Sequence, residues 1–172
     1  MPETNLAAVL GRKGQGKTTL LKAIVEAHRK ERRNTYFMVL DSTREWTPKP
    51  RLEILDSLNW SANRAALRAI EHKNRVTLVI PEVDKYAPKT GLAPGEPLTL
   101  IVNEGRHLGV ALLCDARRTA RVHNDIGYLA DTLFMFRHTG PNDLDWIARV
   151  CGPEWAHAVR NLPDHAFVRY EL

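Results

Sequence analysis

The sequence is poor in the residues that build metal centres and disulfide frameworks. Only two cysteines, Cys114 and Cys151, occur in 172 residues, and both lie in apolar stretches. We therefore expect buried free thiols in a reducing compartment rather than a disulfide-stapled fold. The seven histidines show no metal-ligand spacing, and no Ser-His-Asp or Cys-His arrangement is visible. The sequence thus gives no indication of a zinc site or of a triad hydrolase.

Long apolar runs are also missing. No segment approaches the ~18–20 consecutive apolar residues that a membrane-spanning helix needs. Residues 1–5 have neither the basic start nor the apolar stretch of a secretory signal peptide. We therefore expect no membrane span and a cytoplasmic location.

The composition is typical of one globular domain. Apolar residues make up 44% and charged residues 26% of a chain long enough for one well-buried core, so we expect a single domain over residues 1–172. The net charge of +5 gives a mild preference for polyanionic partners. The basic cluster 28–33 lies at the end of an expected helix, where cations are favoured anyway. We therefore interpret that cluster as a solvated face.

A glycine-rich loop near the start of the chain is its most informative stretch. The apolar run 6–10 leads into the loop and an amphipathic stretch follows it, which predicts strand, loop and helix in that order. The loop fits the phosphate-binding pattern G-x-x-x-x-G-K-[ST]. Its glycines let backbone N–H groups curl around a polyphosphate, and the following helix adds N–H donors and the positive end of its dipole. The residues that we expect to bind nucleotide are Gly11, Arg12, Lys13, Gly14, Gln15, Gly16, Lys17, Thr18 and Thr19.

Two side chains of this loop carry specific chemistry. Lys17 is placed to reach the β- and γ-phosphates of ATP, and we expect it to face solvent in the empty site. The Thr18 hydroxyl is placed to ligate the Mg²⁺ that bridges these phosphates. The alternative is a glycine turn that binds nothing, and the position of the loop between an apolar strand and an amphipathic helix argues against it.

Strands and helices alternate along the rest of the chain. Strands are predicted at 6–10, 35–41, 52–55, 76–80, 110–114, 132–136 and 166–170. Helices are predicted at about 17–31, 61–73, 98–107 and from 141, with a proline- and glycine-rich loop at 85–97. In the helix at 61–73, Ala66, Leu67 and Ile70 are expected to face inward. This order indicates βαβ units, and therefore an α/β fold with a mostly parallel central sheet and helices on both faces.

A P-loop ATPase needs a second strand that delivers carboxylates to the metal and to the attacking water. The β-branched run 76–80 is the candidate, and it leads into Pro81, Glu82 and Asp84. Position 81 usually holds an aspartate, but here it is a proline without a carboxylate. We expect Glu82 to polarise the water and Asp84 to join Thr18 around the metal. The alternative is that both acids are solvated loop residues.

The run 103–119 resembles the FtsK/HerA superfamily of DNA-pumping ATPases. Members of that superfamily read approximately E-A-R-x-x-G-V-x-h-h-h-A-T-Q-R-P, and this chain follows the pattern without a gap from Glu104 to Thr119. The continuation through 125–126, 130–132 and 134–137 fits as well, and residues 41–46 resemble the superfamily's D-P-x-G-E-[YF]. By size the chain is similar to the compact genome-packaging ATPases of membrane-containing bacterial and archaeal viruses.

The resemblance implies a RecA-like P-loop NTPase domain that binds Mg·ATP and moves DNA. It implies an ATP-dependent DNA translocase, a viral genome-packaging motor, that works as a homo-oligomeric, hexameric ring on DNA phosphates without sequence preference. A capsid or portal vertex would be a further partner, and the location would be the host cytoplasm or the virion. Arg106 stands where the pattern has an arginine, and related motors supply such an arginine to the neighbouring subunit's site. The alternatives for this role are Arg118, Arg121 and Arg137.

Two departures from the pattern bear on hydrolysis. Pro81 replaces the metal-binding aspartate, and Arg117 replaces the glutamine that senses the γ-phosphate. Arg117 is able to hydrogen-bond the γ-phosphate itself, or to pair with Glu82 and block the water. Slow or regulated turnover is therefore one expectation. Two other functions stay open, a nucleotide-binding assembly protein without hydrolysis and a small nucleotide kinase.

Overall fold

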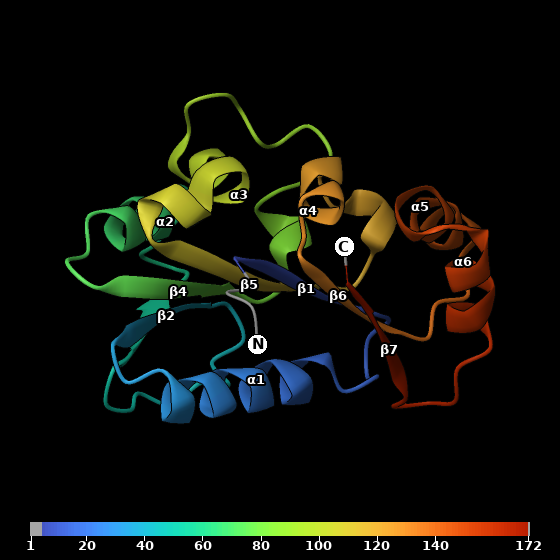
Figure 1. The fold of residues 1–172 in the computed structure, drawn as a ribbon, viewed down its shortest axis with the longest axis horizontal. Coiled ribbons are helices and arrows are strands. Elements are labelled where there is room, and N and C mark those ends of the chain that lie inside the picture. The colour runs from blue at the N-terminus through green and yellow to red at the C-terminus, as the bar shows by residue number, and fades with distance from the viewer. Residues whose placement is uncertain (1–4, 172) are drawn as a thin grey trace.

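The computed structural model describes residues 5–171, which form a seven-stranded sheet with helices on both faces (Figure 1). The strands follow the order β3-β2-β4-β5-β1-β6-β7, and all neighbours are parallel except β6 and β7. The bounds are β1 Leu6–Leu10, β2 Thr35–Asp41, β3 Leu52–Asp56, β4 Arg75–Ile80, β5 Val110–Ala116, β6 Thr132–Phe136 and β7 Phe167–Glu171. The prediction of a mostly parallel sheet is confirmed.

The helices cover the two faces unequally. Helix α1 (Lys17–Glu31) covers one face, the lower face in Figure 1. Helices α2 (Ala62–Ile70), α3 (Pro97–Leu108) and α4 (Asn124–Tyr128) lie on the other face, and α5 (Pro141–Cys151) and α6 (Pro153–Arg160) lie near the β6–β7 end. Two short 3₁₀ turns, η1 (Val83–Lys85) and η2 (Thr119–Arg121), follow β4 and β5. Among residues 5–171, no helix combines the length and apolarity required to cross a membrane.

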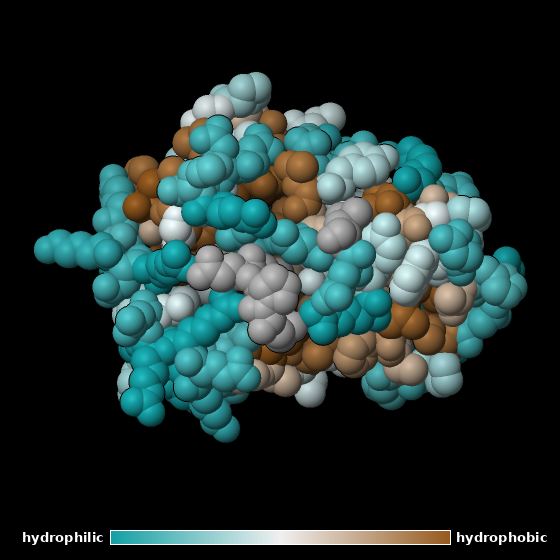
Figure 2. Space-filling view, in the orientation of Figure 1, coloured by the Kyte–Doolittle hydropathy of each residue, from teal (hydrophilic) through white to brown (hydrophobic). Residues whose placement is uncertain are grey.

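The strands are buried on both faces, so successive side chains enter two different cores. In β5, Leu112 and Cys114 belong to the core under α2–α5, whereas Leu113 belongs to the smaller core against α1. Because side chains alternate along a strand, Asp115 lies on the α1 side, like Leu113. Polar residues cover most of the face seen in Figure 2, and apolar side chains show between them. Both cysteines are buried and free, as predicted.

Helix α2 differs from its prediction in length and in the face that it buries. It ends at Ile70 rather than near 73, although Ser61 caps its start as expected, with its hydroxyl accepting from the Arg64 N–H at 3.2 Å. The prediction that Leu67 faces inward was wrong, because this side chain is 45% exposed. Alanines fill the buried face instead, and their spacing defines one helical stripe that lets α2 approach the sheet closely. They are Ala62, Ala65, Ala66 and Ala69.

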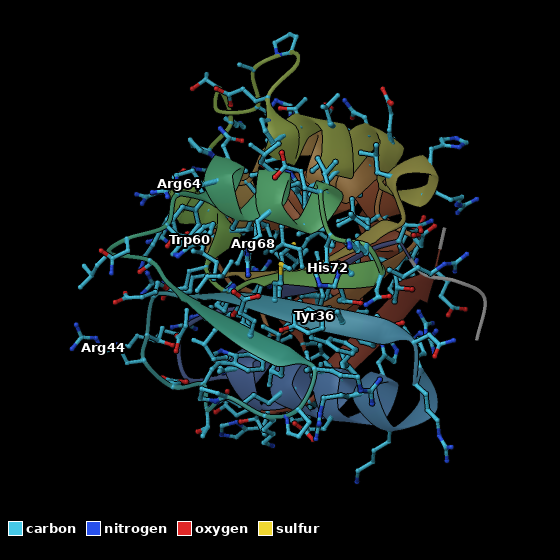
Figure 3. The ribbon with its side chains drawn as sticks, turned by 90° about the vertical axis from the view of Figure 1, so that its left-hand side faces the viewer. Tyr36, Arg44, Trp60, Arg64, Arg68 and His72 are labelled. Carbon is cyan, nitrogen blue, oxygen red and sulfur yellow. The ribbon has the colours of Figure 1, made fainter. Side chains whose placement is uncertain are left out.

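Side-chain contacts support α2 at the β3 edge of the sheet (Figure 3). The indole of Trp60 lies under two guanidinium groups, Arg64 at 5.0 Å and Arg68 at 5.7 Å from the ring centroid. Arg68 also binds the Glu53 carboxylate on β3 at 2.8 Å. Beside them, Tyr36 of β2 stacks on His72 with ring centroids 4.6 Å apart. These contacts tie the loops around α2 to the sheet edge.

The end of α1 is fastened by a single arginine from another part of the chain. Arg51 donates from Nη1 to the carbonyl oxygens of Arg32 at 2.8 Å and Arg33 at 2.6 Å. Its Nη2 donates to the Arg29 carbonyl at 2.7 Å. Carbonyls at a helix end lack partners within the helix, so Arg51 satisfies groups that basic side chains of the helix itself often serve.

Candidate active site at the carboxyl edge of the sheet

The glycine-rich loop joins β1 to α1 at the carboxyl edge of the sheet, and two of its glycines are required by geometry. Gly16 has φ 96°, in the left-handed region that side chains with a Cβ rarely adopt. Gly11 lies so close to β6 that a Cβ built on it would be 2.6 Å from Cβ of Phe136. The loop is therefore pressed against the sheet at its start and turns sharply at its end. The structure thus explains why positions 11 and 16 of the motif are glycines.

Lys17 is buried in this site, and the prediction that it faces solvent was wrong. The residue is 6% exposed, and its Nζ donates to the Arg12 carbonyl at 3.1 Å. Its aliphatic stem folds back over Gly11, where a Cβ would meet Lys17 Cδ at 3.5 Å. Burial lowers the pKa of this ammonium, and Arg117 lowers it further, although Asp115 opposes both. The Lys17 side chain thus lies inside the curve of the loop, where an incoming phosphate would contact it.

Glu82 follows β4 directly and is held by two cations. Its backbone is in the left-handed region at φ 55°, an unusual conformation for a residue with a side chain. Its Oε1 lies 3.0 Å from Arg117 Nη2, and its Oε2 is paired with Lys85. Strained backbone of this kind is concentrated at functional sites. Of the two alternatives that the sequence left open for Arg117, the pairing with Glu82 is the one present in this structure.

Two aspartates lie near Glu82 and Lys17. Asp84 Oδ1 is buried and has no hydrogen-bond partner within residues 5–171. Asp115, 3% exposed at the end of β5, accepts the Glu82 backbone N–H at 2.5 Å. Burial raises the pKa of Asp115, against the effect of the Glu82 N–H and of Lys17. All three acids act electrostatically on Lys17.

Asp115 is the site residue that the sequence reasoning missed. The available signal was a carboxylate one residue before the end of an otherwise apolar strand, at a position where the FtsK/HerA pattern has alanine. A charged side chain is almost never fully buried unless it has a partner or a ligand.

The loop after β2 supports the site from the side. Burial alone would raise the pKa of Asp41, but N–H donors of Thr43 and Trp46, at 2.9 and 3.1 Å, hold it below its usual value. Asp41 therefore acts as the anchor of this loop. Arg44, at the position of the superfamily's glycine, has φ 56°, which is the conformation that glycine adopts freely.

A cleft of about 510 Å³ opens beside the loop and is strongly basic. Its lining residues with charged or polar side chains are Arg12, Lys13, Asp84, Arg117, Arg118, Arg121, Thr139 and Asp143. Asp143 accepts from Thr119 Oγ1 and from the Ala120 N–H, both at 3.0 Å, and so ties η2 to α5. The cations outnumber the carboxylates in the lining, which suits a polyphosphate.

A second segment crosses the glycine-rich loop from the C-terminal part of the chain, and the sequence did not predict it. Gln15 donates to Asp164 at 3.1 Å and accepts the His165 backbone N–H at 3.3 Å. Arg137 also binds Asp164, at 3.4 Å. These bonds hold residues 164–165 against the outer side of the loop.

Arg106 lies at the other edge of the sheet. It precedes β5, and its Nη2 is 3.5 Å from Asp131 Oδ1. Here a second cleft, of about 590 Å³, is lined by Arg32, Arg33, Arg75 and Arg106, and its lining includes no carboxylate. The structure thus gathers Lys17, Glu82, Asp84 and Arg117 at the carboxyl edge and places Arg106 away from them.

Magnesium fits this donor set only together with phosphate oxygens. Within residues 5–171, no group of three His, Cys, Asp or Glu side chains could hold a metal alone. Mg²⁺ usually binds one or two protein oxygens along with phosphates and waters. The unpartnered Asp84 oxygen is one such protein oxygen. The Thr18 hydroxyl is the one that the P-loop pattern supplies.

Comparison with known proteins identifies the fold. No protein-family model and no curated protein sequence matches the chain. Among solved structures, the genome packaging NTPase B204 from Sulfolobus turreted icosahedral virus 2 in complex with ATPγS has a TM-score of 0.84 at 20% identity, over 99% of this chain and 93% of that one. The complex of the same NTPase with AMP has a TM-score of 0.82 at 21% identity, over 99% of this chain and 94% of that one.

A further likeness, to the conjugation coupling protein TcpA of pCW3 with ATPγS, has a TM-score of 0.65 at 16% identity. It covers 98% of this chain and 58% of that protein. These likenesses show a RecA-like P-loop NTPase fold, as predicted, and they agree with the resemblance read from the motifs.

Proposed function

We propose that this chain is an ATPase that binds Mg·ATP at the carboxyl edge of its sheet and uses hydrolysis to move DNA, as a viral genome-packaging motor. The observation that carries the proposal is the convergence of Glu82, Asp84 and Arg117 on Lys17 within a P-loop. The likeness to a genome packaging NTPase over nearly the whole chain supports it. Such a motor would act in the host cytoplasm and dock at a capsid or portal vertex.

The chain's own residues divide the chemistry among them. Lys17 and the loop N–H groups bind the β- and γ-phosphates, and Thr18 and Asp84 hold the metal. Bound Mg²⁺ would neutralise charge on these phosphates and orient them. Glu82 positions the attacking water, which requires that Arg117 leaves its carboxylate. An arriving γ-phosphate offers Arg117 a stronger partner, because it carries more charge than one carboxylate.

The position of Arg106 supports the ring that we propose. In its own subunit this arginine lies at the far edge of the sheet, so it would reach only a neighbour's γ-phosphate. The loop 86–96 would face the central channel. Lys85 is paired with Glu82, which leaves Lys89 for DNA phosphates. Phosphate contacts of this kind are independent of sequence and weaken steeply with salt.

The test is ATP turnover by the purified chain with and without duplex DNA. We expect DNA to raise turnover and Lys17→Ala to abolish it. Mixing Glu82→Gln with Arg106→Ala subunits should restore activity at interfaces that keep both groups, because an arginine supplied in trans is worth about 10³–10⁵ in turnover. Arg160→Ala, an exposed arginine on α6, is the matched control. A monomer at micromolar concentration with ATP and DNA, and no rescue, would refute the ring.

One observation favours a second function, a nucleotide-binding assembly protein without hydrolysis. Both oxygens of Glu82 are engaged, by Arg117 and by Lys85, so this carboxylate is unavailable to water in this conformation. ATP binding without turnover, in the presence and absence of DNA, would select this alternative.

A further inference from the structure

The catalytic edge lacks a carboxylate at the position that normally supplies one. β4 ends at Ile80, and the next residue, Pro81, offers neither a carboxylate nor an N–H. Asp84 is three residues further along, beyond the left-handed turn at Glu82. A substitute on a neighbouring strand would have to meet two conditions, the same height along the sheet and the same face.

Asp115 meets both conditions. Ile80 pairs with Cys114 in the parallel register of β4 and β5, so the residues that follow, Pro81 and Asp115, lie at the same height. Val79 and Leu113 both belong to the core against α1, and alternation places positions 81 and 115 on that same face. Adjacent strands are about 4.8 Å apart. Asp115 is therefore one strand away from the missing carboxylate.

Strand β5, which carries Asp115, is also nearer the P-loop than β4 is. β5 pairs directly with β1, and Asp115 is opposite Val9, two residues before Gly11. Its Oδ1 accepts the Glu82 N–H at 2.5 Å, and Oδ2 has no hydrogen bond to any residue of the range 5–171. Asp115 is 3% exposed, and a carboxylate that is removed from water in this way and has a single donor is costly unless a ligand or water adds a further contact.

We propose that Asp115 takes the place of the aspartate that Pro81 displaces, and that its Oδ2 binds the Mg²⁺ of Mg·ATP directly or through one of its waters. The proposal rests on the proposed function, because it concerns the metal of that same site. Through Oδ1, the same carboxylate fixes the backbone of Glu82. One side chain thus connects the metal to the residue that positions the attacking water.

The first test is the gain in nucleotide affinity that Mg²⁺ provides. A fluorescent ATP analogue is titrated into the full chain with Mg²⁺ and with EDTA, and Mn²⁺ binding to the complex is measured by electron paramagnetic resonance. Asp115→Asn keeps an acceptor for the Glu82 N–H but lacks the charge. We expect unchanged affinity in EDTA and a loss of about 10–100-fold in the Mg²⁺ gain, the range seen when groups that orient metal ligands are removed.

Controls separate metal binding from a merely structural role. Asp145→Asn on the exposed side of α5 removes the same charge from a residue that does not line the basic cleft, and it should change nothing. Asp84→Asn reports the contribution of the other candidate ligand. Melting temperatures show whether each variant folds, and Asp115→Ser replaces Asp115→Asn if the latter does not.

The second test is rescue. Asp115→Ala should lose the Mg²⁺ gain, and adding Pro81→Asp should restore part of it, because the carboxylate returns from the adjacent strand. A wild-type Mg²⁺ gain in folded Asp115→Asn, or no restoration by Pro81→Asp in a folded double variant, would overturn the proposal and leave the ATPase function standing. Absence of any Mg²⁺-dependent nucleotide binding by the wild type would instead refute the proposed function.

Discussion

Lys17→Met should make the empty protein more stable while it removes affinity for ATP. The ammonium is 6% exposed, and its one hydrogen bond within residues 5–171 goes to the Arg12 carbonyl. Burial lowers the pKa of Lys17 despite the attraction of Asp115, so the folded environment disfavours the charge. Methionine has a similar length and no charge. Replacing a whole buried ion pair by apolar residues of similar volume is often neutral or stabilising by about 1–4 kcal/mol, whereas removing one member of a pair is destabilising. Lys17 forms no ion pair within residues 5–171, so its removal breaks none.

We take about 1–2 kcal/mol as the expected gain, because the nearby carboxylates lose a counter-charge. For a chain of this size, each kcal/mol raises the melting temperature by about 2–4 °C. The direction in which this stability gain changes with pH also follows from the lowered pKa. The pKa of Lys17 in the folded state is below the unfolded value of 10.5, so the cost of the ammonium is full below the folded-state pKa and is relieved as pH rises from there toward 10.5. The advantage of the variant should therefore shrink toward pH 10.

Thermal unfolding followed by circular dichroism, without nucleotide, measures this difference between pH 7 and pH 10. Lys13→Met is the matched control, since Lys13 is an exposed lysine of the same loop and its loss should matter by less than about 0.5 kcal/mol. A parallel titration with Mg·ATP should show at least about a tenfold loss of affinity for Lys17→Met. A variant less stable than wild type at pH 7, or a difference that does not change with pH, would refute the argument from burial.

Three other expectations concern the same edge of the sheet and the core beneath it. Glu82→Gln should bind ATP normally and lose about 10²-fold in single-turnover hydrolysis, and an unchanged rate would transfer the role to another acid. Gly11→Ala forces a Cβ to within 2.6 Å of Phe136 Cβ, so urea unfolding should show a free energy of unfolding lower by about 1–3 kcal/mol. An unchanged free energy of unfolding would mean that β6 shifts to accommodate the methyl group. Burial raises the pKa of Cys151 to about 12 and also raises that of Cys114. At pH 8, maleimide should therefore label both thiols only after the chain unfolds. Rapid labelling of the folded chain would contradict their burial.

The sequence predicted the elements whose signals are local. The P-loop was predictable because its glycines and Lys17 occupy fixed positions within seven residues. The apolar runs located the six parallel strands to within one or two residues. Glu82 was readable because it directly follows a buried strand. Each of these signals depends on neighbours in the chain.

The features that escaped prediction depend on contacts between distant segments. The proximity of Asp115 to position 81 follows from the register of β4 against β5, which no single run of residues encodes. Lys17 is buried because its stem folds over Gly11, and Leu67 is exposed because four alanines determine which face α2 presents. Residues 164–165 reach Gln15 across about 150 positions of sequence.

Helix α1 has a mechanical consequence. It spans 15 residues, or about 22 Å, and begins at the phosphate-binding loop. Arg51 clamps its last turn, and the next two residues, Arg32 and Arg33, line the basic cleft at the opposite edge of the sheet. We expect a helix held in this way to move as one rigid body. We therefore expect a displacement of the loop by a bound phosphate chain to be transmitted along α1 to these arginines at the other edge of the sheet.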